Sequence, residues 1–172
     1  PTRVHFQRLR PRLGALCDIP DLELLPARYP GLRTLKFRAA LELGLAQRGL
    51  ALLAALRRAG LLRRPQDLAP LLNRSASLLD RFGSALGGMV VRVQGLDASG
   101  AAAGRAWHIA ADDDHGPEIP CMAAILLARR LARGDASLPS GARACMGLLS
   151  LAEFEPEFAR WGMVTDLVEA GP

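Results

Sequence analysis

Lysine is almost absent from this chain: Lys36 is the only one among 22 basic residues, and the rest are arginines. Aromatic residues make up only 5% of the sequence and are not interleaved with the arginines, as a platform for stacked bases would require. The arginines are scattered pairs rather than one run. The net charge of +5 is therefore interpreted in terms of solubility and association, and we expect no nucleic-acid partner.

Long apolar runs are also missing. The best candidate, residues 39–56, is interrupted by Glu42, Gln47 and Arg48, whereas a membrane span needs about 20 apolar residues. No secretory signal opens the chain, so we expect a cytoplasmic location and no membrane partner. Because the first residue is Pro1 rather than methionine, we expect the chain to be a fragment of a longer protein.

Cysteine is scarce too. Cys17, Cys121 and Cys145 are too far apart for a CxxC pair, and an odd number argues against a full set of disulfides. We expect a reducing compartment, in which each cysteine packs as a small apolar side chain.

The apolar half of the 172 residues is enough for one packed domain, expected over 1–172. Residues 18–31, rich in proline, are expected to form a loop or an edge strand. Helical periodicity and stop signals predict helices over 41–60, 70–83, 120–134 and 151–161. Alternation predicts strands over 3–9, 33–38, 89–94, 106–109 and 163–168. This order predicts an α+β fold, a mostly antiparallel sheet with helices packed on one face.

The motifs of several enzyme classes are absent. The sequence has no G-x-G-x-x-G after a strand, no G-x-x-x-x-G-K, no G-x-S-x-G and no H-E-x-x-H. We therefore expect no cofactor-binding residues in this chain, and we do not expect it to be an enzyme by itself.

The richest polar stretch runs from Asp112 to Pro120 and contains three aspartates and His115. Adjacent side chains of an extended loop point alternately, and no second ligand cluster follows, so a solvated acidic loop is favoured over a metal site. The stretch leads into a helix whose free N–H groups attract anions. Cys121 in the first turn could be a thiol of lowered pKa, but an unreactive cysteine is the favoured interpretation.

Three segments together resemble the bacterial saccharopine dehydrogenase-like oxidoreductases. They are the run 20–34, the helix opening 116–120, and the stretch 141–149 before Leu151-Ala152-Glu153-Phe154. The resemblance covers nearly the whole chain. It implies a protein with an N-terminal Rossmann domain that binds NAD(P), absent here, followed by an α+β domain that shapes the substrate pocket and forms a homodimer.

The resemblance also suggests site residues for the longer parent protein. Tyr29 and Arg33 would bind the small-molecule substrate, with Arg33 holding a carboxylate. His115 or Glu118 would relay a proton as catalytic residues. The alternative is a freestanding protein-interaction or small-ligand-binding module without catalytic activity. The coding sequence upstream of this chain would separate the two hypotheses.

Overall fold

The computed structural model describes residues 1–169, and these residues form two compact units, each described here by itself. Unit 1 comprises Pro1–His5 and Arg10–Ser84, and unit 2 comprises Phe6–Leu9 and the chain from Ala85 onward. Each unit has its own three-stranded antiparallel sheet. The α+β class is confirmed, but the strands form two small sheets instead of one. The expectation of a single domain over 1–172 stays a prediction.

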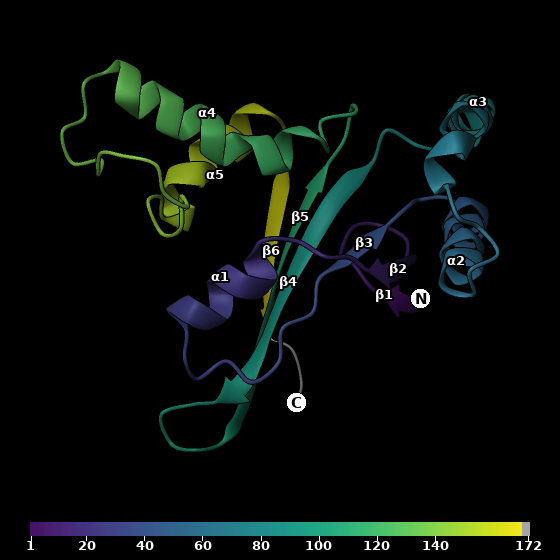
Figure 1. Ribbon diagram of the computed structural model, residues 1–172. Coiled ribbons are helices and arrows are strands. Elements are labelled where there is room, and N and C mark those ends of the chain that lie inside the picture. The colour runs from purple at the N-terminus through teal and green to yellow at the C-terminus, as the bar shows by residue number, and fades with distance from the viewer. Residues whose placement is uncertain (170–172) are drawn as a thin grey trace. The chain divides into compact units, whose positions relative to one another are not determined.

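Unit 1 combines a small sheet with three helices (Figure 1). Its strands pair antiparallel in the order β1 (Thr2–Val4), β2 (Arg12–Leu16) and β3 (Arg38–Ala40). Its helices are α1 (Asp21–Arg28), α2 (Gly44–Arg58) and α3 (Ala69–Leu79), with short 3₁₀ turns at Pro65–Leu68 and Asp80–Phe82. The expected helices over 41–60 and 70–83 are confirmed in α2 and α3.

Two predictions for unit 1 are wrong. Helix α1 replaces the loop or edge strand expected over 18–31, because Pro20 and Pro30 lie outside the helix and only Pro26 lies within it. The carboxylates of Asp21 and Glu23 in its first turn interact favourably with the positive end of the helix dipole and stabilise α1.

The strands expected over 3–9 and 33–38 are wrong for most of their length, because only residues 3–4 of the first and Arg38 of the second lie in a strand. Only Thr2–Val4 and Arg38–Ala40 pair with β2, and residues 6–9 belong to unit 2. Strand β2 itself was missed, because Gly14 at its centre weakens the alternating pattern.

Unit 2 follows the sequence-based expectation closely (Figure 1). Strands β4 (Gly87–Leu96) and β5 (Ala102–Ala111) form the hairpin, and β6 (Val164–Glu169) pairs with β5. Helices α4 (Glu118–Ala132) and α5 (Leu151–Arg160) follow the hairpin in sequence. The Asp97 carboxylate closes the hairpin turn by accepting bonds from the Ser99 hydroxyl and the N–H groups of Ser99 and Ala101, which lower its pKa.

The core of unit 2 lies between α4, α5 and one face of its sheet. Ile109 of β5 and Met122 of α4 are the largest fully buried side chains, and Phe158 of α5 packs with them. Trp107 lies two residues from Ile109 on the same face, and its ring is 6.0 Å from that of Phe158. The expected packing of helices on one sheet face is confirmed in unit 2.

Arg130 connects the end of α4 to the segment that leads to α5. Its guanidinium donates to the Asp135 carboxylate (2.7 Å), the Ser137 hydroxyl (3.0 Å), the Leu148 carbonyl (3.1 Å) and the Glu153 carboxylate (3.3 Å). The Ser137 hydroxyl and then Arg130 lower the pKa of Asp135 to about 2. One arginine thus satisfies polar groups along a stretch that has no regular secondary structure.

A capping box begins α5. The Glu153 carboxylate accepts bonds from the Ser150 N–H (2.7 Å) and the Ser150 hydroxyl (2.8 Å), and both lower the pKa of Glu153.

The opposite face of the unit 2 sheet is crossed by residues 6–9. The Gln7 N–H donates to Nδ1 of the buried His108 (3.2 Å), and Arg8 donates twice to Asp166 (2.7 and 2.8 Å). Leu9 is buried beside Gly88. Burial first, and then Arg92, lower the pKa of His108, while Asp166 opposes them.

Among residues 1–169, no helix is both long and apolar enough to cross a membrane. Cys17, Cys121 and Cys145 are free thiols, but all three are exposed. The expectation that they pack as apolar side chains is therefore wrong. In α4 it is the neighbouring Met122 that points into the core.

We expect unit 2 to lose stability as the pH falls from 7 towards 5. The pKa of His108 is lowered in the folded state, so its stabilising contribution is complete above the ordinary value of 6.5. It is lost as the pH falls through the lower, folded-state pKa. Protonated Nδ1 can no longer accept the Gln7 N–H. Denaturant unfolding at several pH values measures the effect.

His108→Gln is the matched control, because its amide oxygen can accept the same bond and does not titrate in this range. The free energy of unfolding of this variant should vary less with pH than that of the native chain. Equal pH dependence in the two proteins would exclude His108 as the cause.

Candidate functional site

The acidic stretch after β5 forms a tight turn that leads directly into α4. Asp113 and Asp114 adopt positive φ angles of 52° and 61°, a region that aspartate tolerates better than most residues. The Asp114 N–H donates to the Ala85 carbonyl (3.1 Å), and the His115 N–H donates to the Asp112 carbonyl (2.9 Å). All three aspartates are exposed, as the interpretation of a solvated loop predicts.

Two glycines hold this turn against the start of β4. A Cβ atom built on Gly87 would lie 2.7 Å from Cα of Gly116, and one on Gly116 would lie 3.1 Å from Cα of Gly87. A side chain at Gly87 would overlap the Gly116 backbone, and one at Gly116 would force the Gly87 backbone to shift by a few tenths of an ångström. This contact fixes the residues on either side of Gly116.

His115 and Glu118 are brought together at the start of α4. His115 Nδ1 lies 3.8 Å from Glu118 Oε1, and both side chains are about one-third exposed. The edge of the His115 ring meets Trp161, with ring centroids 4.7 Å apart and planes at 74°. Glu118 Oε2 is buried and has no hydrogen-bond partner within the described chain. A partly exposed imidazole beside a carboxylate can accept and release a proton.

Tyr29 and Arg33 lie on the turn that follows α1 in unit 1. The Tyr29 N–H donates to the Leu25 carbonyl (2.9 Å) and its own carbonyl accepts from Leu32 (2.9 Å), so this turn is ordered. The Arg28 guanidinium lies 5.9 Å from the centre of the exposed Tyr29 ring. Arg33 is exposed and forms no ion pair within residues 1–169, so its guanidinium can reach an anion.

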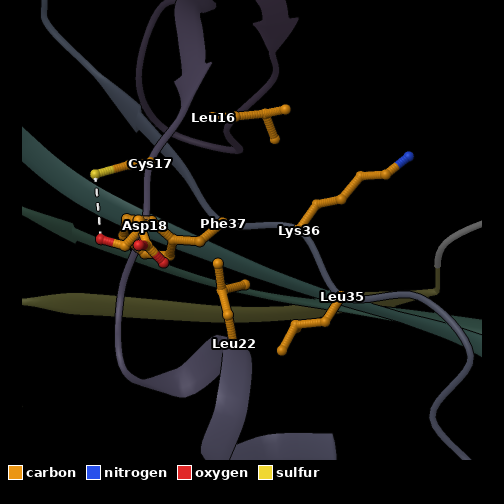
Figure 2. Close-up of a pocket in the computed structure, with 7 residues that line it drawn as sticks. All are labelled: Leu16, Cys17, Asp18, Leu22, Leu35, Lys36 and Phe37. Atoms are coloured by element: carbon orange, nitrogen blue, oxygen red, sulfur yellow. Dashed lines mark hydrogen bonds between the residues drawn. The ribbon is translucent and has the colours of Figure 1, made fainter.

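A hollow of about 340 Å³ lies in unit 1, two residues beyond Arg33 along the chain. Figure 2 shows Leu22 of α1 beside Leu35, while Lys36 extends its ammonium away from them. The Cys17 thiol donates to the Asp18 carbonyl (3.7 Å) at the wall of the hollow. The lining residues are Leu16, Cys17, Asp18, Leu22, Leu35, Lys36 and Phe37. Sequence reasoning missed this hollow, because it depends on α1, which was expected to be a loop.

The four expected site residues thus form two pairs in two units. His115 and Glu118 belong to unit 2, whereas Tyr29 and Arg33 belong to unit 1. Their convergence on one cleft stays a prediction. In the described part of the chain, no group of three or more His, Cys, Asp and Glu side chains is placed to hold a metal ion.

Comparison with family models, curated proteins and solved structures found no match to this chain.

Gly87→Ala should destabilise the chain by about 1–3 kcal/mol, because the added methyl group overlaps the Gly116 backbone. The matched control is Gly49→Ala in α2, where nothing lies within 4 Å of the added atom. That control should be neutral or more stable by up to about 1 kcal/mol, as alanine favours a helix over glycine. Urea denaturation measures both variants. A Gly87→Ala protein as stable as the native chain would show that the turn is not held by this contact.

Glu118→Gln should change the Tm by no more than about 2 °C. The substitution removes a carboxylate whose Oε2 has no partner, and it breaks no hydrogen bond within the described residues. Glu153→Gln is the control, because its amide oxygen can still accept the bonds from Ser150 but its NH₂ group faces the Arg130 guanidinium, from which the Glu153 carboxylate accepts (3.3 Å). Its Tm should fall by roughly 2–4 °C. Thermal melts decide: an equal loss in both variants would make Glu118 a structural residue and not a candidate proton carrier.

Proposed function

We propose that this chain is the C-terminal substrate-side and dimerisation domain of a saccharopine dehydrogenase-like NAD(P)-dependent oxidoreductase. It is inactive alone, because the nicotinamide cofactor is held by an N-terminal Rossmann domain of the longer parent. The parent acts in the cytoplasm, as a homodimer, on a small-molecule substrate.

The proposal rests on the resemblance and on one structural observation, the contact between His115 and Glu118. His115 directly precedes one of the three resembling segments, residues 116–120, and Glu118 lies within it, and the Gly87–Gly116 approach holds both at the start of α4. The contact of His115 with Trp161 restricts the orientation of the imidazole. A carboxylate with an unpartnered buried oxygen is costly for stability, which supports a role in binding or proton transfer.

Each of the four candidate site residues has a side chain whose chemistry suits one role in the proposed function. The Arg33 guanidinium binds a substrate carboxylate through two parallel hydrogen bonds, and the phenol of Tyr29 donates a third. Glu118 accepts or returns a proton, and His115 passes it towards solvent. NAD(P) bound to the other domain supplies the hydride chemistry.

The alternative, a ligand-binding module without catalysis, is favoured by the hollow beside Leu22 and Leu35. The hollow has a volume of about 340 Å³ and is largely open to solvent, and apolar side chains form most of its wall. The upstream coding sequence distinguishes the two. A strand followed by a glycine-rich fingerprint supports the oxidoreductase domain, and its absence supports the module.

The isolated chain should not bind nicotinamide cofactor. We expect no saturable signal when it is titrated with NADH or NADPH by calorimetry or fluorescence. The parent protein, titrated in the same way, should bind one of the two. A dissociation constant below about 100 μM for the isolated chain, roughly 5.5 kcal/mol of binding free energy, would overturn the assignment of cofactor binding to another domain.

A further inference from the structure

Helix α2 carries leucines outward and a polar side chain inward. The buried residue of α2 is Gln47, whose Oε1 accepts a hydrogen bond from the Leu41 N–H (3.0 Å). Leu45 and Leu52, seven residues apart and therefore on one face of the helix, are 74% and 61% exposed. A surface helix of a globular protein normally has the reverse arrangement, so this exposed face indicates a binding surface.

Helix α3 repeats this face. Leu71 and Leu78 are again seven residues apart, and they are 64% and 66% exposed, as is 62% of Phe82 in the 3₁₀ turn that follows. Each helix also has an arginine three residues after its first exposed leucine, Arg48 in α2 and Arg74 in α3. Both helices thus contain the pattern Leu-x-x-Arg-x-x-x-Leu, which places apolar and cationic side chains next to one another.

The net positive charge of the chain lies in the same segment. Residues 44–82 contain seven arginines and two aspartates, which leaves 15 basic and 15 acidic residues of the 22 and 17 in the whole chain. All seven arginines are exposed, and none of them forms an ion pair within residues 1–169. They are Arg48, Arg57, Arg58, Arg63, Arg64, Arg74 and Arg81. The segment therefore attracts an anionic partner.

A second copy of this chain is a poor partner for this surface. Two such surfaces would bring arginines together, which is unfavourable. Unit 2 contains 8 basic and 11 acidic residues, but four of its carboxylates already bind arginines of unit 2. Three others form one short loop, residues 112–114, which is too small to cover two helices. The four bound carboxylates belong to Asp135, Glu153, Glu157 and Asp166.

An anionic lipid bilayer fits both properties of the surface. Arginines attract negatively charged headgroups, and leucine and phenylalanine side chains enter the boundary between headgroups and acyl chains. A folded protein partner needs complementary shape as well as complementary charge. A fluid bilayer needs only the right composition, and a composition is what the two convex helix faces have in common.

We propose that α2 and α3 bind the surface of an anionic bilayer, lying on the membrane without crossing it. The expectation of no membrane partner rests on the lack of a spanning segment, which surface binding does not need. The proposal is independent of the oxidoreductase assignment. It agrees with a cytoplasmic parent, because the cytoplasmic leaflet carries anionic lipids. The inserted side chains are those of Leu45, Leu52, Leu71, Leu78 and Phe82.

The test is vesicle binding by the whole chain. Flotation measures the bound fraction on vesicles of phosphatidylcholine alone and on vesicles of phosphatidylcholine mixed with phosphatidylserine. We expect binding to the mixed vesicles to be at least about tenfold stronger, and to weaken at high salt. Absence of binding to the mixed vesicles, or equal binding to both kinds, would overturn the proposal.

A leucine double variant tests the apolar contribution. Leu52→Gln combined with Leu78→Gln should weaken binding to the mixed vesicles at least about tenfold, because less apolar surface enters the interface. The matched control combines Leu96→Gln with Leu131→Gln, two leucines of unit 2 that are 75% and 64% exposed. The control should bind as the native chain does. An equal loss in both double variants would exclude α2 and α3 as the binding surface.

An arginine double variant tests the charge. Arg48→Gln combined with Arg74→Gln should weaken binding to the mixed vesicles about tenfold or more and reduce its salt dependence. Arg105→Gln combined with Arg133→Gln is the control, because both arginines are exposed and lie outside the segment. Unchanged binding of the first pair would contradict the assignment of the headgroup contacts to α2 and α3.

The same variants without vesicles identify any other occupant of the surface. A Tm of the leucine variant more than about 4 °C below that of its control would show that these leucines pack against another part of the chain. A native dimer that becomes a monomer in the leucine variant, measured by light scattering, would assign the surface to a second copy. Binding of soluble polyglutamate as tight as that of the mixed vesicles, and unaffected by the leucine substitutions, would assign it to acidic chains. Each of these results would overturn the bilayer proposal.

Discussion

The close approach of Gly87 and Gly116 is the contact on which unit 2 depends. It joins the first residue of β4 to the turn that follows β5. The two strands of the hairpin are therefore connected at the end opposite the Asp97 turn as well as at the turn itself. Helix α4 begins two residues later, and its start places Glu118 beside His115. A side chain at either glycine would push the turn outward and carry this pair with it. The geometry of the candidate proton-transfer site therefore depends on the absence of two side chains.

The second half of strand β5, residues 106–111, is buried or half-buried on both faces, and a different kind of interaction covers each face. Ile109 packs under α4 and α5 through apolar contacts, which are insensitive to pH. His108 on the other face is bound by the backbone of Gln7, and burial lowers its pKa, so this side responds to acid. Arg130 holds the stretch between the two helices through polar contacts alone. The apolar core and its polar supports are thus separate, and acid should weaken the polar supports before it weakens the core.

The sequence predicted the parts of the fold that local patterns determine. Alternation predicted the two strands that form the hairpin, and helical periodicity predicted α5. The predictions from the sequence were wrong where the secondary structure depends on tertiary packing. The prolines near α1 predict a loop, although two of them lie outside the helix, and Gly14 interrupts the alternation of β2. For the site, the resemblance suggested His115 and Glu118, but their contact with each other was not predicted, and neither Trp161 nor Gly87 could be connected to them. Both lie far away in the sequence.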